Sequence, residues 1–316
     1  MPLPNLSALL GKSSHHDRVH HYPDLAPLRA ALRAKDWPAV VAYFERLPEH
    51  NDPTVATYLV AETRGVEKFL RTAGGGPASS TLAGSLLGAR LVIMAWDARG
   101  AGRADVTSDR QFREFHKILL EAEQVLGDVT AENPGDVAAW TSRLKTARGL
   151  SMGLDEANRR YERAAKARAN PVAAQSNHLQ QLCPKWGGSL ERLHAFARAC
   201  ADNAPAGSLN AAVVAEAHLE HAYHEGNLHY LRQPPVLAEI QDAVARSVGH
   251  PDHRPVHGWV QAEACFAFVL WHAGDYAGAA ERMAALGDRV TDSYPWFDKD
   301  EFASVRRILR GMGGAR

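Results

Sequence analysis

Apolar residues recur every three or four positions along most of this 316-residue chain. That spacing places side chains on one face of an α-helix. The stretch that begins at Asp24 shows it first, with apolar side chains at Leu25, Leu28, Ala31 and Leu32. β-Branched and aromatic residues almost never alternate with polar ones over four or more positions, as a half-buried strand would require. The predicted fold class is therefore all-α.

Residues that favour helix starts mark the boundaries of these segments. Asp36 can cap a helix that has Pro38 in its first turn, and Asp52 stands before Pro53 in the same way. Proline is tolerated there because the first turn does not use its missing N–H group. We predict helices over residues 24–35, 36–47, 52–71, 80–98, 109–132, 136–149, 154–168, 171–183, 189–202, 208–225, 235–248, 256–273, 275–287 and 298–310.

Two of the predicted turns share a pattern in which a small or polar residue is followed by Asp, an aromatic residue and a small residue. They are Lys35-Asp36-Trp37-Pro38-Ala39 and Gly274-Asp275-Tyr276-Ala277-Gly278-Ala279, and they resemble the turn of a tetratricopeptide repeat (TPR). A middle unit has Trp140 after Asn133-Pro134, then Ala157, Tyr161 and Ala164 at the repeat's small, aromatic and small positions. Small residues let antiparallel helices approach closely. The intervals between units vary, so we predict TPR-like helical hairpins stacked in an irregular α-solenoid.

A more particular segment is Cys183-Pro184-Lys185-Trp186-Gly187-Gly188-Ser189, which is followed by Phe196-Ala197-Arg198 on the next predicted helix. It resembles the signature of an uncharacterised bacterial family with TPR-like organisation. The resemblance covers most of the chain after about residue 25 and implies a fold, but no reaction or ligand. Locally, the two glycines can take positive φ at a sharp corner that Ser189 follows as a helix cap. Trp186 would pack over that corner, either as structure or as part of a ligand pocket.

The ends of the chain differ in composition from its middle. Residues 1–21 contain His15, His16, His20 and His21 and lack an apolar stripe over 13–23, so we predict a flexible His-rich lead-in. Residues 22–316 form the predicted TPR-like helical domain. The glycine-rich tract at 73–79 is a possible hinge within it.

Charge and cysteine content restrict the environment and the partners. Lys and Arg together number 36, as do Asp and Glu, so no global field favours a nucleic-acid or membrane partner. The chain has three cysteines, Cys183, Cys200 and Cys265, without C-x-x-C pairing, and we predict reduced, mostly buried thiols. No cleavable leader is recognisable, and no apolar run approaches the ~18 residues of a membrane span. We therefore predict a cytoplasmic protein.

Two sets of residues on the predicted helix 208–225 could carry function. Glu216, Glu220 and His224 form a row at four-residue spacing, which can line a groove together with residues near Trp186. His218, His221 and Glu225 lie on another face with the spacing of metal ligands. His218 also falls on the helix's apolar stripe, so a core histidine that is hydrogen-bonded to a neighbour explains it without metal.

Motifs of other functional classes give little support to an enzyme. The sequence has no G-x-x-x-x-G-K-[ST] phosphate loop and no H-E-x-x-H, and its G-x-S-x-G string at residues 149–153 follows no predicted strand, as a nucleophile elbow would require. The basic residues Arg159, Arg160, Arg163, Lys166 and Arg168 alternate with acidic ones, which indicates a salt-bridged helix face. We predict a non-enzymatic scaffold that binds a protein or peptide in a groove and needs no cofactor. The alternative is a metal-dependent enzyme or accessory protein that uses His218, His221 and Glu225. The oligomeric state is not predicted.

Overall fold

The computed structural model describes residues 17–73, 77–100, 107–289, 291, 294–296 and 298–313. Within these ranges every regular element is helical and no strand occurs. The predicted all-α fold class is confirmed. The glycines of the tract proposed as a hinge, Gly74 to Gly76, lie outside the described residues, as do His15 and His16.

The chain forms two compact units. The N-terminal unit comprises residues 22–181, and the C-terminal unit comprises residues 182–313 together with 17–21. The division falls at the end of α11 (Val172–Leu182), just before the segment that carries Trp186.

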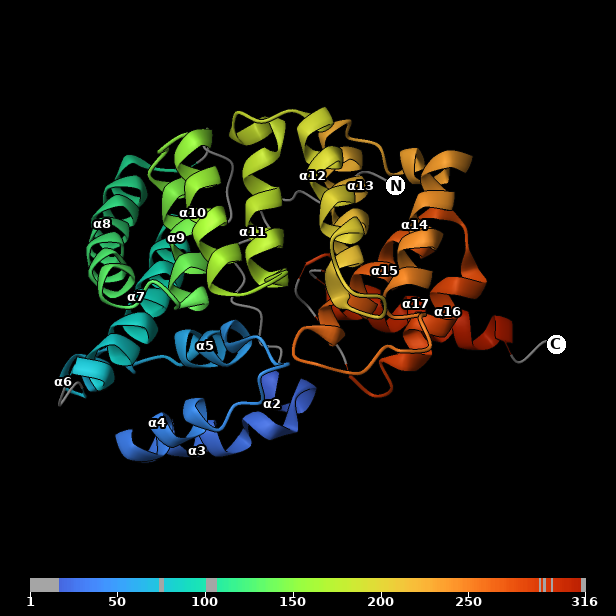
Figure 1. Ribbon diagram of the computed structural model, residues 1–316. Helices are drawn as coiled ribbons and strands as arrows, with labels where there is room; N and C mark the ends of the chain where they lie inside the picture. Colours follow the sequence, from blue (N-terminus) through green and yellow to red (C-terminus); the bar gives the residue numbers. More distant parts are fainter. Residues whose placement is uncertain are drawn as a thin grey trace. The chain divides into compact units, whose positions relative to one another are not determined.

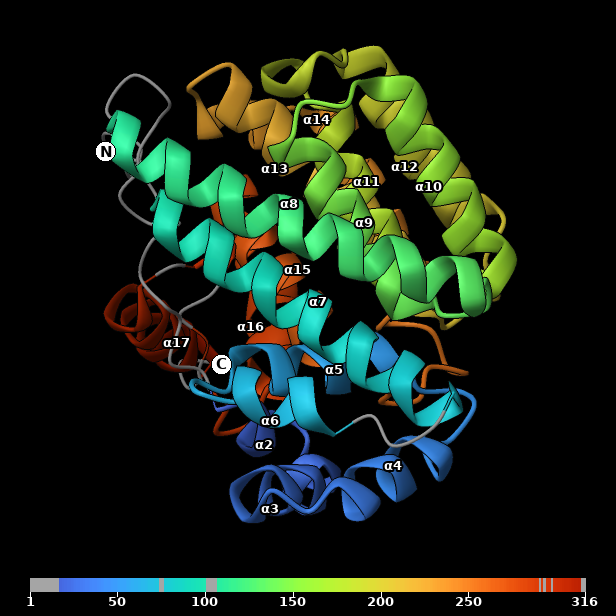
Figure 2. The same cartoon turned by 90° about the vertical axis from the view of Figure 1, so that its left-hand side faces the viewer.

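The N-terminal unit begins with a 3-10 turn, η1 (Pro23–Leu25). The helices that follow are α3 (Ala26–Ala34), α4 (Trp37–Glu45), α5 (Pro53–Glu62), α6 (Glu67–Thr72), α7 (Pro77–Arg99), α8 (Asp109–Glu132), α9 (Val137–Gly149), α10 (Leu154–Ala167) and α11. The long helices α7 and α8 lie side by side (Figure 2), and α9 to α11 follow as neighbouring helices (Figure 1).

The predicted turn pattern has the same backbone geometry at both of its occurrences. Lys35 and Gly274 take left-handed conformations, with φ of 55° and 89°, and each ends a helix. The next residue caps the following helix: the Asp36 carboxylate accepts from the Ala39 N–H at 3.1 Å, and Asp275 caps its helix in the same way. The pattern therefore encodes a sharp reversal between two helices.

One predicted helix is wrong in extent. The segment 52–71 is divided into α5 and α6, because Thr63 leaves the helical conformation with ψ of 111°. The Thr63 hydroxyl donates to the Leu59 carbonyl at 2.8 Å, one turn back in α5. Such local bonds compete with continuation of the helix. The apolar period runs on across this break, which is why the sequence indicated a single helix.

The small and aromatic residues of the predicted middle unit are buried or lie against one buried cluster. Trp140, Leu144 and Ala164 belong to one buried cluster in the N-terminal unit, and Tyr161 packs against it. Ala157 is also fully buried. These small residues bring α9 and α10 close together, while the Trp140 ring fills the adjacent space.

A buried carboxylate joins α8, α9 and α10. Glu123 accepts two hydrogen bonds of 2.8 Å from Arg160 and one of 2.6 Å from Arg143, and the Thr146 hydroxyl also donates to it. Burial alone would raise the pKa of Glu123, but the hydrogen bonds from Arg160 and Thr146 hold it below its usual value. The carboxylate is therefore ionised, and three helices meet at it.

Helix α7 contains a stretch, Thr81–Arg99, that is long and apolar enough to cross a membrane by length and composition. The prediction that no apolar run approaches this length does not hold by that criterion. In the structure 56% of this stretch is buried, and α7 packs against α5, α6, α8 and α9. Arg90 lies in its middle and pairs with Glu67 at 2.6 Å. A helix at the core of a folded unit meets the same length and composition criterion.

The C-terminal unit starts with the 3-10 turn η3 (Pro184–Trp186). It continues with α12 (Leu190–Asp202), η4 (Leu209–Ala211), α13 (Ala212–His224), η5 (Leu228–Arg232), α14 (Pro234–Arg246), α15 (Trp259–Ala273), α16 (Tyr276–Ala285) and α17 (Lys299–Gly313) (Figure 1). Helix α15 is buried on nearly all sides, and the Trp296 indole N–H donates to the Ala264 carbonyl at 2.9 Å.

The described end of the predicted lead-in also belongs to this unit. Residues 18–21 form the short helix α2 (Arg18–His21), and the His21 side chain is buried. Arg289 donates to the His21 carbonyl at 3.4 Å. Val19 and His21 are therefore packed, although the sequence there lacks an apolar stripe.

The two glycines of the corner have different structural roles. Gly187 has φ of 90°, as predicted, and a Cβ there would meet no atom within 4 Å. Gly188 has no positive φ, but a Cβ there would lie 1.9 Å from the Leu182 carbonyl oxygen. The predicted cap is confirmed, because Ser189 Oγ accepts from the Arg192 N–H at 3.2 Å. The corner therefore depends on close backbone approach at Gly188 more than on conformation.

We expect Gly188→Ala to destabilise the protein by about 3 kcal/mol or more, because the backbone must move to relieve the overlap. Gly187→Ala should cost about 1 kcal/mol, since only the left-handed conformation is strained. Urea unfolding measures both. Gly311→Ala in α17, where a Cβ would meet nothing, is the control and should not destabilise. Equal losses for the two corner variants would contradict this account.

Candidate functional site

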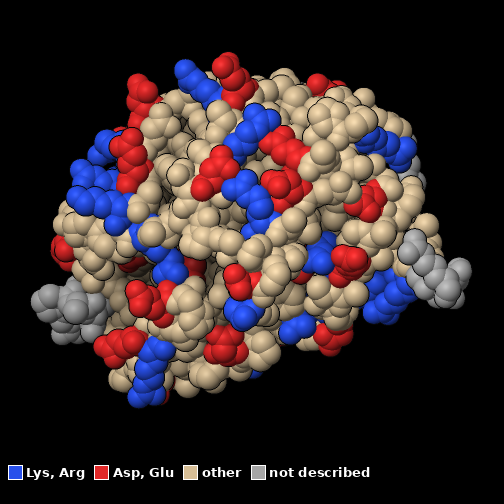
Figure 3. Space-filling model, turned by 45° about the vertical axis from the view of Figure 1, so that its right-hand side comes forward, with Lys and Arg blue, Asp and Glu red and all other residues tan. Residues whose placement is uncertain are grey.

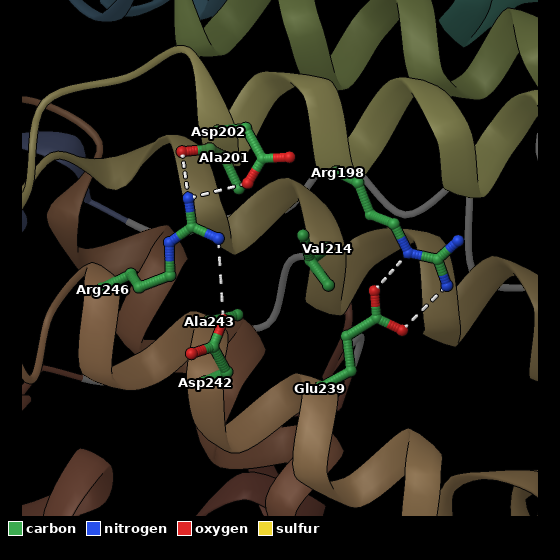
Figure 4. Close-up of a pocket in the computed structure, with 8 residues that line it drawn as sticks. All are labelled: Arg198, Ala201, Asp202, Val214, Glu239, Asp242, Ala243 and Arg246. Carbon is green, nitrogen blue, oxygen red and sulfur yellow. Dashed lines mark hydrogen bonds and ion pairs between the residues drawn. The ribbon is translucent and has the colours of Figure 1, made fainter.

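The described residues of α12, α13 and α14 enclose a pocket of about 180 Å³ in the C-terminal unit (Figure 4). Its lining combines charged side chains with a small apolar floor, in which Val214 is the contribution of α13. The residues are Arg198, Ala201, Asp202, Val214, Glu239, Asp242, Ala243 and Arg246.

Two arginines link the helices on either side of this pocket. Arg246 on α14 donates to the Asp202 carboxylate and to the Ala201 carbonyl, both at 2.9 Å, and lies 3.6 Å from Asp242. Arg198 on α12 holds Glu239 with two bonds of 2.6 and 3.0 Å. Figure 4 shows the two clusters at opposite ends of the pocket, with Val214 between them. The pocket thus offers both signs of charge.

Glu239 connects the pocket to a buried histidine. Its Oε2 lies 3.0 Å from His218 Nε2, and His218 Nδ1 lies 3.0 Å from the Tyr230 hydroxyl. The hydrogen bonds from Arg198 lower the pKa of Glu239 to about 2, whereas burial lowers the pKa of His218. Burial also raises the pKa of Tyr230 to about 12. At neutral pH the carboxyl is therefore ionised, and the imidazole and the phenol are uncharged.

These charge states assign the protons. His218 donates its Nε2–H to Glu239 and accepts the Tyr230 hydroxyl proton at Nδ1. With a raised pKa, Tyr230 is not activated as a nucleophile, and His218 has no nitrogen left over to act as a base. The chain of Glu239, His218 and Tyr230 is therefore a satisfied polar network in the core.

A second histidine pair lies beside this network. His194 Nε2 is 2.8 Å from His221 Nδ1, and His221 Nε2 is 3.1 Å from Glu225. Burial, with the nearby His218 and His221, lowers the pKa of His194 to about 4. A neutral His194 can donate to His221, which in turn donates to Glu225.

The residues proposed as metal ligands are only partly brought together. His221 and Glu225 are in contact, but His218 directs its two nitrogens to Tyr230 and Glu239. Among the residues that the structure describes, no group of three or more His, Cys, Asp or Glu side chains is arranged to hold a metal ion. His218 is 2% exposed, as its position on the apolar stripe indicated.

The residues proposed to line a groove have three different environments. Glu216 is half-buried, Glu220 is only 4% exposed, and His224 is exposed at the end of α13. Glu220 therefore does not line an open groove. Its carboxylate pairs with Lys185 at 2.6 Å, and Trp186, next in sequence, is half-buried.

Two groups near Glu220 have pKa values above their ordinary range. Cys183 Sγ lies 3.7 Å from the Glu220 carboxylate. Burial raises the pKa of Tyr223 and of Cys265, and the negative charge of Glu220 adds to both shifts. All three cysteines are buried and unbridged. With raised pKa values, Tyr223 and Cys265 are not poised for nucleophilic chemistry.

Sequence reasoning missed the residues that make the pocket. Arg198 stood only in the segment that follows the corner motif, and its partner Glu239 lies 41 positions further along the chain. Asp202 and Arg246 are separated by 44 positions. No local spacing relates residues so far apart, so only the packing of α12 and α14 against α13 reveals the pocket.

Comparison with protein-family models, with curated proteins and with solved structures gave no significant match.

We expect the protein to lose stability as the pH falls from about 6.5, the ordinary histidine pKa, towards 4. The folded-state pKa of His194 is about 4, so in this window the unfolded chain binds the proton and the folded chain does not. His194→Gln should reduce the stability difference between pH 7.5 and pH 5.0 by about 1–2 kcal/mol after allowance for solvent screening. Urea unfolding at both pH values tests this, with His224→Gln as the exposed control. An unchanged difference in His194→Gln would contradict it.

We expect His218→Ala to lower the free energy of unfolding by about 2–3 kcal/mol, because it leaves the Tyr230 hydroxyl without its acceptor and Glu239 with one donor fewer. His224→Ala, on the exposed end of the same helix, should change it by less than about 0.5 kcal/mol. Thermal unfolding of the parent with and without a chelator completes the test. A drop in Tm on chelation that is absent in His218→Ala would favour a metal site instead.

Proposed function

We propose that this protein is a non-enzymatic scaffold of TPR-like helical hairpins that binds a protein or peptide partner. The turn geometry at Lys35 and Gly274 and the packing of Trp140 beside Ala157 and Ala164 support a repeat-like arrangement in an irregular α-solenoid. Stacked hairpins provide binding surfaces without catalytic groups. The proposal includes membership of the bacterial TPR-like family that the Cys183 to Ser189 segment resembles, for which the family comparison gave no match.

The observation that carries the proposal is the pocket between α12 and α14, in which paired charges remain accessible. The side chains of Arg198 and Arg246 are 55% and 41% exposed, and that of Asp242 is 65% exposed. Exposed ion pairs contribute only about 0–1 kcal/mol each, so a partner can replace them at little cost. A peptide that presents both an acidic and a basic side chain would match the pocket.

The balance of surface charge favours a protein partner over a nucleic acid or a membrane. Figure 3 shows acidic and basic side chains interspersed on the face that it draws. Lys and Arg equal Asp and Glu in number over the whole chain. Polyanion binding draws on a basic surface. Together with the three unbridged cysteines, this leads us to propose a cytoplasmic protein.

The pocket between α12 and α14 replaces the groove predicted along α13 as the main contact surface. Glu220 is buried and paired with Lys185, so it does not contact a partner. Trp186, Glu216 and His224 remain accessible in part and are candidates for secondary contacts. The main contacts move to Arg198 and Arg246.

Affinity capture with the immobilised full-length protein, followed by mass spectrometry and measurement of the dissociation constant for the captured partner, tests the proposal. We expect Arg246→Glu to weaken binding at least about tenfold, or about 1.4 kcal/mol. Arg307→Ala, an exposed arginine on α17, is the control and should bind as the parent does. Circular dichroism establishes that each variant is folded.

Two results would contradict the proposal. One is a partner that binds Arg246→Glu and Asp242→Lys as tightly as the parent. The other is the absence of any partner together with one equivalent of metal in protein that lacks residues 1–16, lost on His221→Ala. That second result would favour the metal-dependent alternative with His218, His221 and Glu225.

A further inference from the structure

A second pocket lies in the N-terminal unit, where the end of α8 meets α9 and α10. Its volume is about 330 Å³. It is lined by Gly127, Thr130, Ala131, Pro134, Trp140, Arg143, Arg159 and Arg163. Three of these side chains are cationic and none is acidic. This composition distinguishes it from the mixed pocket between α12 and α14.

The three arginines differ in how far their charges are already paired. Arg143 bonds Glu123 at 2.6 Å and the Thr130 hydroxyl at 2.7 Å, and its buried Nε has no hydrogen-bond partner among the described residues. Arg159 holds Glu156 with bonds of 2.8 and 2.7 Å. Arg163 is exposed and makes no hydrogen bond or ion pair with any described residue. The pocket therefore contains one unpaired cation and one unsatisfied donor.

The charge of the whole cluster exceeds what its own carboxylates neutralise. The buried Arg160 shares Glu123 and Glu156 with Arg143 and Arg159. Four arginines and two glutamates, counting Arg163, leave a net charge of two positive units. The acidic residues Asp128 and Glu132 of α8 do not line the pocket.

The spacing on α10 adds a local repulsion. Arg159 and Arg163 are four residues apart on one helix, and like charges at this spacing destabilise a helix by about 0.2–0.5 kcal/mol. An anion between them would remove that cost. Guanidinium groups bind phosphate and carboxylate oxygens through paired N–H donors.

We propose that this pocket binds a phosphate monoester. A monoester carries a charge of about −1.5 to −2 at pH 7, which matches the net charge of the cluster, whereas a carboxylate supplies only half of it. Arg163 and Arg159 contact the phosphate oxygens from α10, and Arg143 closes the site from α9. The Arg143 guanidinium lies over the Trp140 ring, 5.1 Å from the ring centre, which helps to hold it in place. This inference does not depend on the pocket between α12 and α14.

Isothermal titration calorimetry with four probes tests the inference: inorganic phosphate, O-phosphoserine, and two capped glycine peptides with a central phosphoserine or glutamate. We expect the phosphorylated peptide to bind at least about tenfold more tightly than the glutamate peptide. If O-phosphoserine binds as tightly as its peptide, the site takes small phosphate esters. If the peptide binds more tightly, a phosphorylated partner is its ligand. Both results support a phosphate monoester site.

Arg163→Gln should weaken phosphate binding about tenfold without a change in Tm, because the side chain supports no other contact. Arg159→Gln is a second variant with the same expectation for binding. Arg113→Gln, on the exposed face of α8, is the matched control and should bind as the parent does. The inference is overturned if no phosphate probe binds at millimolar concentration, if the glutamate peptide binds as tightly as the phosphorylated one, or if both Arg163→Gln and Arg159→Gln bind as the parent does.

Discussion

Partly buried carboxylates between helices tie neighbouring helices together in each unit, because each of them needs partners from those helices. Glu123 draws Arg143 of α9 and Arg160 of α10 to α8. Glu239 of α14 binds Arg198 of α12 and His218 of α13. Removing a charge from water costs several kcal/mol, so each carboxylate is stable only while its helices stay in place. Their relative positions are therefore set by chemistry as well as by apolar packing.

The same requirement explains the corner before α12. Glu220 is nearly excluded from water, and Lys185 reaches it from the turn Pro184–Trp186. The turn can lie that close only because Gly188 presents no side chain to the Leu182 carbonyl. A lysine, a tight turn and a glycine thus act together to pair one buried charge. This gives the Cys183 to Ser189 segment a structural role, whatever else Trp186 contributes on the surface.

The helices were predictable because their signals are local. Apolar spacing and the caps at Asp36, Asp52 and Ser189 depend on residues within one turn, and the structure confirms them. The break at Thr63 was not predictable, since a threonine in mid-helix more often keeps the helix going and the apolar period continues beyond it. Burial of Glu220 was missed for a related reason. Glutamates at four-residue spacing are typical of a solvent-exposed helix face, and no local pattern indicates that Lys185 lies beside Glu220.

The candidate sites were largely invisible in the sequence, because their residues lie on separate helices and meet only after these helices have packed. The structure also separates two kinds of charge within each cluster. Arg160 and His218 are buried and fully bonded, so their replacement would disturb the fold. Arg246 lies further out, where an ion-pair partner can be exchanged at a cost of about 1 kcal/mol or less, and Arg163 has no described partner to lose. A ligand that binds Arg163 or Arg246 would leave the buried pairs of that cluster intact. Each cluster can therefore stabilise its helices through the buried pairs and still exchange contacts at its surface.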